Sequence, residues 1–86
     1  MMEVETETMP ITLEAAARYS RERRPAHDAP VVDWIRHRKM QVELYKRVAE
    51  KDIENRKDAL RLLATIKYTL EDMRERYARG QREWAS

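Results

Sequence analysis

The fold is decided by the stretch from Val31 to Arg79, which reads VVDWIRHRKMQVELYKRVAEKDIENRKDALRLLATIKYTLEDMRERYAR and contains neither Gly nor Pro. Gly weakens a helix through its backbone entropy, and Pro breaks one because it lacks an N–H. The stretch is therefore predicted to form a single long helix, about 73 Å from end to end. A helix of that length must either bend or pair with another helix.

Apolar residues recur along this stretch with the heptad spacing of a coiled coil. Eleven of the fourteen a and d positions are apolar or aromatic, and the exceptions are Arg38, Asp52 and Arg56. Asp52 and Arg56 divide the seam into two halves. The predicted seam residues are Ile35, Val42, Tyr45, Ala49, Asp52, Arg56, Ala59, Leu63, Ile66, Leu70, Met73 and Tyr77.

The two halves of the seam match each other when they run antiparallel. Each a position then meets a d position, and the residue numbers of every pair sum to 108, so that Ala49 meets Ala59 and Asp52 meets Arg56 as an ion pair. An unbroken helix gives an antiparallel dimer from these pairs, whereas a turn near residues 52–55, with Asn55 as the cap of the second helix, gives a hairpin within one chain. The lack of Gly and Pro favours the dimer; the hairpin and a parallel or higher coiled coil are the alternatives.

Residues on either side of the long helix complete the predicted organisation. Residues 1–11 are expected to be a flexible acidic arm, and residues 12–86 a single helical domain. Thr12 can cap a short helix, Pro25 stops it, and Gly80 is placed to end the long helix. The domain is predicted to contain a helix over 13–24, a hinge over 25–30, the long helix over 31–79 and a tail over 80–86. Leu44, Val48, Leu60 and Leu62 widen the apolar face enough for a third helix, from residues 13–24 or from another protein.

Composition agrees with an all-α fold, in which a short N-terminal helix accompanies a long helix that forms an antiparallel coiled-coil dimer or a helical hairpin. Ala, Glu, Lys, Leu and Arg make up 45 of 86 residues, as is typical of coiled coils. No apolar run approaches the roughly 20 residues of a membrane span, and the acidic start lacks the basic region of a secretory signal. The chain has no Cys. We expect a cytoplasmic protein that makes no membrane contact.

Positive charge is concentrated between residues 18 and 39, a segment that contains seven basic and three acidic residues. Arginines could neutralise a negatively charged partner, and the aromatic rings beside them could anchor a protein or stack on bases. The candidate partner-binding residues are Arg18, Tyr19, Arg21, Arg23, Arg24, Trp34, Arg36, Arg38 and Lys39.

The sequence contains no recognisable catalytic arrangement. Ser20 lies in a basic helix, and no Gly-rich phosphate loop is present. Asp33 and His37 share a helix face, but two ligands make a poor metal site. We expect a non-enzymatic protein with no metal and no cofactor: a helical protein-interaction module, acting as an oligomer, that serves as an adaptor, assembly factor or small inhibitor. The alternative is a nucleic-acid-binding accessory protein that uses the Arg-rich segment 18–39.

Overall fold

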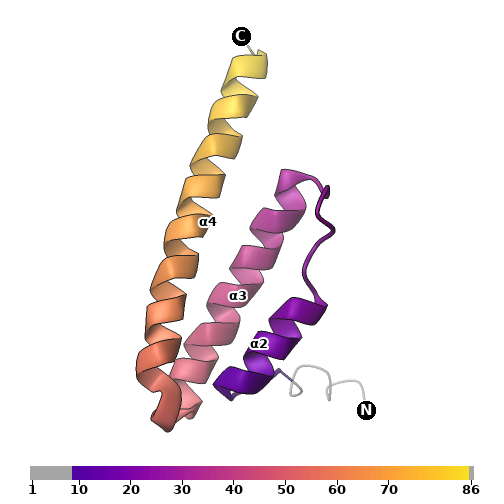
Figure 1. Cartoon of the computed structure of the whole chain (residues 1–86). Helices are drawn as coiled ribbons and strands as arrows, with labels where there is room; N and C mark the ends of the chain where they lie inside the picture. The colour runs from indigo at the N-terminus through magenta and orange to yellow at the C-terminus, as the bar shows by residue number, and fades with distance from the viewer. Residues whose placement is uncertain (1–8, 86) are drawn as a thin grey trace.

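Three α-helices and one short 3₁₀ turn form the described part of the molecule (Figure 1). The computed structural model describes residues 9–85, with side chains as far as residue 81, so most of the predicted acidic arm lies outside the described residues. The elements are α2 (Leu13–Glu22), α3 (Val31–Lys51), the 3₁₀ turn η1 (Ile53–Asn55) and α4 (Arg56–Ala85), with no strand among the described residues. The predicted all-α class is confirmed.

α3 lies between α4 and α2, and it runs antiparallel to both (Figure 1). α3 and α4 are joined by η1 into a hairpin, and α4 continues well past the beginning of α3. The chain therefore pairs the two halves of its seam with each other.

The long helix predicted over residues 31–79 is interrupted after Lys51, so that prediction was wrong. Asp52 leaves the helical conformation at φ −97° and ψ 82°. The Arg56 side chain then reaches back to α3, where its Nε donates to the carbonyl of Ala49 at 2.6 Å and its Nη2 to that of Glu50 at 3.3 Å. The turn needs no Gly, because no described residue has a positive φ.

Asp52 and Arg56 do not form the ion pair that the register predicted. One carboxylate oxygen of Asp52 accepts hydrogen bonds from the backbone N–H of Leu13 at 2.9 Å and from the side-chain amide of Asn55 at 3.0 Å. The sequence predicted that Asn55 caps the following helix. Its side chain instead donates to Asp52. Both polar exceptions to the seam serve the turn, and Asp52 also holds the first residue of α2.

The seam itself is buried in its middle and open at its far end. Its six buried members are Tyr45, Ala49, Ala59, Leu63, Ile66 and Leu70. Ile35, Val42 and Met73 are half-buried, whereas Tyr77 remains 42% exposed. The buried residues belong to the predicted heptads, and α3 and α4 pack on each other within one chain.

α2 supplies the third helix, and its Ala16 joins the same hydrophobic core cluster as the seam residues. Thr12 caps it as predicted, because its hydroxyl accepts from the backbone N–H of Ala15 at 3.3 Å. Ala16 of α2 and Leu44 and Val48 of α3 are fully buried in the core. Burial of side chains as large as Leu44 and Val48 stabilises the fold by about 1.5–3 kcal/mol each.

Helix ends differ from the predicted ones at two places. α2 ends at Glu22, two residues before the predicted limit. α4 passes through Gly80 and continues to Ala85, so Gly80 is not a C-cap and residues 80–85 are not a separate tail. Gly80 has an ordinary φ and open space around it, and a helical Gly costs about 1 kcal/mol relative to Ala. Nothing in the structure explains this glycine.

Candidate binding crevice

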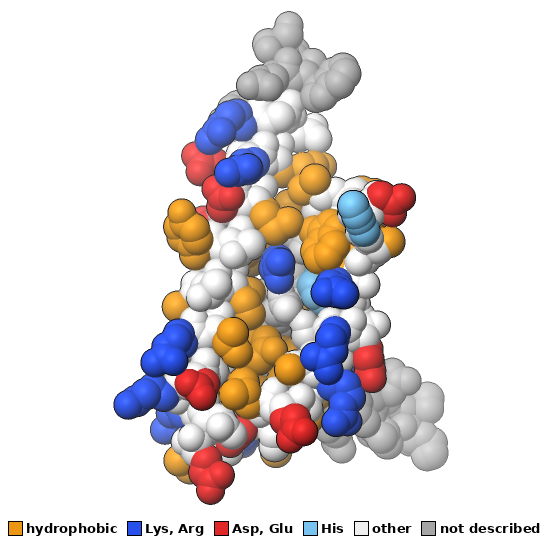
Figure 2. Space-filling model, viewed as in Figure 1, with side chains coloured by type: hydrophobic (Ala, Val, Ile, Leu, Met, Phe, Trp, Pro, Cys, Tyr) orange, Lys and Arg blue, Asp and Glu red, His pale blue; other side chains and the backbone are white. Residues whose placement is uncertain are grey.

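Four of the nine predicted partner-binding residues line one hollow between α2 and α3, which we call the α2–α3 crevice. They are Arg21, Arg24, Trp34 and Arg38, and the hollow measures about 240 Å³. Figure 2 shows this side of the molecule, with Lys and Arg side chains along α2 beside the hydrophobic valley between α2 and α4. Two helices thus bring together basic residues that lie up to 17 positions apart in the sequence.

Helical periodicity explains how the walls of the crevice are built. On α2, Ala17 and Arg21 lie four residues apart, and Arg24 follows in the loop, two residues after the end of the helix. On α3, Trp34, Arg38 and Gln41 follow one another at intervals of four and three residues. Residues with this spacing project from one face of a helix, so packing α2 on α3 places Ala17 and Arg21 beside the row on α3, and the loop adds Arg24.

A hydrogen-bonded chain of side chains forms the floor of the crevice. Arg38 Nη1 donates to the side-chain Oε1 of Gln41 at 2.7 Å. The side-chain Nε2 of Gln41 in turn donates to the hydroxyl of Ser20 at 2.6 Å. Ser20 and Gln41 are both buried. These two hydrogen bonds fix α2 to α3 and hold the guanidinium of Arg38 in position. The Nε of Arg38 is also buried, and it has no hydrogen-bond partner in the described part of the protein.

The crevice carries positive charge that no acid among residues 9–81 neutralises through an ion pair. Arg23 contacts Glu22 at 3.7 Å and Arg36 contacts Asp33 at 3.3 Å. By contrast, Arg21, Arg24 and Arg38 form no ion pair within the described residues.

Two titratable groups in the crevice respond to this environment. Burial, followed by the charges of Arg38 and Arg24, lowers the pKa of His37 below its ordinary 6.5. Burial raises the pKa of Tyr45 above its ordinary 10.0, and the charge of Arg21 opposes that increase. Both groups are therefore neutral at pH 7, and the net charge of the crevice comes from its arginines.

Trp34 forms the aromatic rim of the crevice. Its ring meets that of His37 edge-on, with the centroids 6.0 Å apart, and the Arg38 guanidinium lies 5.9 Å from its centroid. Trp34 and Arg24 also line a second hollow of about 420 Å³ with Pro25 and His27. The ring therefore stands between two hollows and is half-buried, a position suited to contact with a bound partner.

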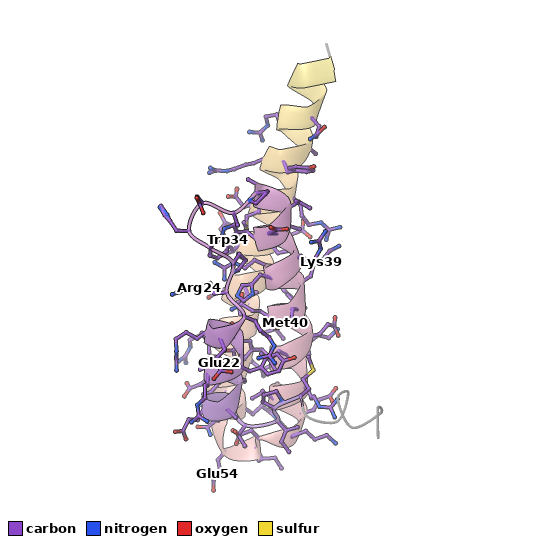
Figure 3. The ribbon with its side chains drawn as sticks, turned by 90° about the vertical axis from the view of Figure 1, so that its right-hand side faces the viewer. Glu22, Arg24, Trp34, Lys39, Met40 and Glu54 are labelled. Carbon is purple, nitrogen blue, oxygen red and sulfur yellow. The ribbon has the colours of Figure 1, made fainter. Side chains whose placement is uncertain are left out.

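The other predicted partner-binding residues lie outside the crevice. Arg23 stacks on Tyr19, with its guanidinium 3.6 Å from the ring centroid. Arg18 and Arg36 are exposed, and Figure 3 shows Lys39 on the opposite edge of α3 from Arg24. These residues share the basic segment but face other directions around their helices.

Sequence reasoning missed the polar floor of the crevice. A signal for it was present, because Leu44 and Val48 had been assigned to a face that packs a third helix. Extending that face towards the start of α3 at helical spacing reaches Gln41 and then His37, both of which are buried. Ser20 lies within the predicted basic segment, but nothing in that segment predicts its bond to Gln41.

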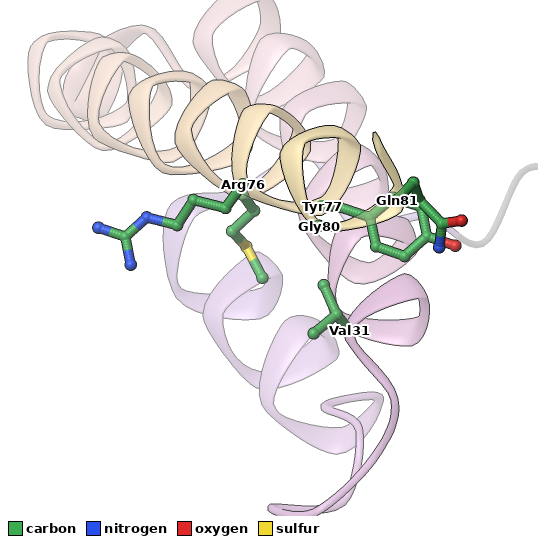
Figure 4. Close-up of a pocket in the computed structure, with 6 residues that line it drawn as sticks. Val31, Arg76, Tyr77, Gly80 and Gln81 are labelled. Atoms are coloured by element: carbon green, nitrogen blue, oxygen red, sulfur yellow. The ribbon is translucent and has the colours of Figure 1, made fainter. Parts of the chain in front are cut away.

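A third hollow lies at the open end of the hairpin (Figure 4). It measures about 410 Å³, and Val31, Met73, Tyr77 and Gly80 contribute to its lining. Val31 and Tyr77 are the last pair of the predicted register, so the seam ends in this partly open apolar hollow.

Two further observations concern metals and membranes. Asp33 bonds to Arg36, and no group of three His, Asp or Glu side chains in the described residues could hold a metal ion. None of the described helices combines the length and the apolar character needed to cross a bilayer.

Comparisons with known proteins add no relative to these observations: no family model matches the chain, and no curated protein or solved structure is significantly similar to it.

Proposed function

We propose that this protein is a non-enzymatic helical binding module whose α2–α3 crevice receives a negatively charged group of another protein. The observation that carries the proposal is the meeting of Arg21, Arg24 and Arg38 at one hollow, without an ion pair to any described acid. Guanidinium groups bind anions through several N–H donors at once, and such charge-assisted hydrogen bonds are stronger than neutral ones.

The chemistry of the crevice suits binding better than catalysis. Ser20, the only aliphatic hydroxyl in its lining, is buried and accepts a hydrogen bond from Gln41. A nucleophilic serine needs an adjacent base within hydrogen-bond reach, and the amide of Gln41 is not a base.

Exposed apolar side chains support a protein as the partner. Leu60, Leu62 and Tyr68 of α4 are exposed, Tyr68 by 77%. Aromatic and arginine side chains are enriched among the residues that dominate protein–protein binding. A partner could thus be oriented by charge at the crevice and gain further contact from apolar side chains elsewhere, as an adaptor, assembly factor or inhibitor requires.

The test is capture of host proteins on the immobilised full chain after nuclease treatment. The crevice variant Arg21→Glu/Arg24→Glu is compared with a matched control, Arg47→Glu/Arg74→Glu, which changes the same charge at two exposed arginines outside the crevice. We expect one partner to be retained by the wild type and the control but not by the crevice variant. Equal retention by all three proteins would contradict the proposal.

A second candidate function is nucleic-acid binding, which the position of Trp34 beside Arg24 and Arg38 favours. An exposed base could stack on the ring while arginines neutralise its phosphates. Phosphate-driven binding weakens steeply with salt because counterions are released. Retention that disappears with nuclease, and binding to a single-stranded oligonucleotide that falls steeply with salt, would favour this function.

The predicted coiled-coil dimer is retained as part of the proposal, in a changed form. Because the hairpin already uses the pairs of the seam within one chain, a dimer that keeps those pairs arises by exchange of α4 between two copies. Each copy would keep its own α2 and α3 together, and therefore its own crevice.

A further inference from the structure

We propose that the α2–α3 crevice recognises a phosphorylated side chain of the partner, with Arg21, Arg24 and Arg38 surrounding one phosphate group. This inference rests on the proposed protein-binding function and names the chemistry that the partner must present.

The charge of the crevice matches a phosphate better than a carboxylate. Three arginines line this hollow, and its titratable floor residues His37 and Tyr45 are neutral at pH 7. A phosphorylated side chain carries a charge of about −1.5 to −2 and three strong acceptor oxygens. A carboxylate brings a single charge and two oxygens, so it would leave one guanidinium without an anionic partner.

Arg38 provides an unused donor at the same place. Its Nη1 is bound by Gln41, which holds the guanidinium in position, whereas its buried Nε has no hydrogen-bond partner among the described residues. A buried donor without an acceptor is unfavourable and rare in native proteins. A side-chain shift of Arg38 that opens its Nε to the hollow would let an oxygen of a bound phosphate supply the missing acceptor.

The distribution of charge around the crevice favours one phosphate over a nucleic-acid backbone. A strand of nucleic acid needs a basic groove that follows several successive phosphates. Here the neighbouring arginines are already engaged, because Arg23 contacts Glu22 and Arg36 contacts Asp33. Arg18 and Lys39 also form no ion pair with a described acid, but neither lines the hollow. Arg21, Arg24 and Arg38 share this hollow of about 240 Å³, a size suited to a single group.

The first experiment titrates the ¹⁵N-labelled full chain with inorganic phosphate, with a phosphoserine tripeptide and with the same tripeptide carrying glutamate. NaCl keeps the ionic strength constant, because salt screens exposed charges. We expect the phosphoserine peptide to give saturable shifts of the Arg38 Nε–H and Gln41 amide signals. It should bind at least about tenfold more tightly than the glutamate peptide, as expected for stronger charge-assisted bonds.

Matched variants show whether those shifts report the crevice. Arg24→Gln removes one guanidinium from an exposed position and should leave the fold intact; we expect it to weaken phosphoserine binding about tenfold. Arg47→Gln, outside the crevice, should leave binding unchanged. Equal affinity for the two peptides, or equal loss in both variants, would overturn the inference. Tighter binding of single-stranded DNA than of the phosphopeptide would overturn it in favour of the nucleic-acid alternative.

The second experiment separates this inference from the proposed function on which it rests. Host lysate is treated with phosphatase before capture on the wild-type protein. Loss of the partner after this treatment supports a phosphate ligand. A partner that survives phosphatase but is lost with Arg21→Glu/Arg24→Glu overturns the phosphate inference and leaves the proposed function standing. A partner that survives both treatments overturns both.

Discussion

Asp52 connects two parts of the molecule through one carboxylate. It accepts hydrogen bonds from the Asn55 side chain and from the backbone N–H of Leu13, and these bonds lower its pKa below the ordinary value of 3.8. A carboxylate whose pKa is lower in the folded than in the unfolded chain stabilises the fold fully above the unfolded pKa, and this stabilisation is lost as the pH falls through the folded pKa.

We therefore expect Asp52→Ala to lower the urea midpoint at pH 7, because it removes both bonds. The difference in urea midpoint between wild type and variant should narrow below about pH 4, where the Asp52 carboxyl of the unfolded wild type begins to take up its proton. Circular dichroism at pH 7 and at pH 3 measures both midpoints. Asp28→Ala, at an exposed position in the α2–α3 loop, is the control. A difference that stays constant across this range would contradict the role given to Asp52.

His37 gives the fold a second dependence on pH, at higher values. Burial and the charges of Arg38 and Arg24 lower its pKa below 6.5, so the unfolded chain takes up a proton before the folded chain does. The free energy of unfolding should be highest above pH 6.5 and should fall as the pH drops below that value. We expect the free energy of unfolding of His37→Gln, measured in urea titrations, to change less between pH 7.5 and pH 5.5 than that of the wild type. His27→Gln, at an exposed position, should behave like the wild type. Equal slopes in all three proteins would refute this.

At the level of elements, the docking of α2 depends on the bond between Gln41 and Ser20. Gln41→Leu leaves the buried Ser20 hydroxyl without its donor and Arg38 Nη1 without its acceptor. Loss of a partner from a buried polar group costs about 1–3 kcal/mol. We expect urea unfolding to show a decrease of this size in the free energy of unfolding. Hydrogen exchange should be faster in α2 than in the α3–α4 hairpin.

The double variant Ser20→Ala/Gln41→Leu provides the control for this prediction. Removing both partners of a buried hydrogen bond is much less costly than removing one, so the second change should restore part of the stability. If the stability losses of Ser20→Ala and Gln41→Leu simply add in the double variant, the bond between Gln41 and Ser20 does not hold α2 in place.

The helices and their facing sides were predictable from the sequence because they follow local periodicity. The heptads identified the residues buried between α3 and α4, and Leu44 and Val48 indicated a third helix. The turn was not predictable in this way, since the same pairs serve a dimer and a hairpin. One bond that holds the turn joins Asp52 to Leu13, 39 residues away, and no local pattern contains that contact. Four crevice residues were predicted from charge and aromaticity, but the polar floor depends on the packing of α2.

At the scale of the whole molecule, the hairpin and the exchanged dimer compete for the same apolar pairs. The hairpin adds the bonds that hold the turn, from Leu13 and Asn55 to Asp52 and from Arg56 to the end of α3. Replacing Asp52 and Asn55 by Ala removes the first two of these bonds and raises the helix propensity of the turn. A continuous helix then becomes more favourable, and its two seam halves must pair with a second copy to stay buried.

We therefore expect Asp52→Ala/Asn55→Ala to shift the protein towards a dimer as its concentration rises, because straightened hinges promote exchange of identical elements. Light scattering coupled to size exclusion measures the mass, and Asp58→Ala, an exposed change near the start of α4, serves as the control. A variant that remains monomeric with unchanged helix content would show that the hairpin does not depend on the Asp52 bonds. Because α2 packs on α3, each copy in an exchanged dimer retains a crevice. The dimer should then bind two phosphoserine peptides, one per chain, with the affinity that the monomer shows for one.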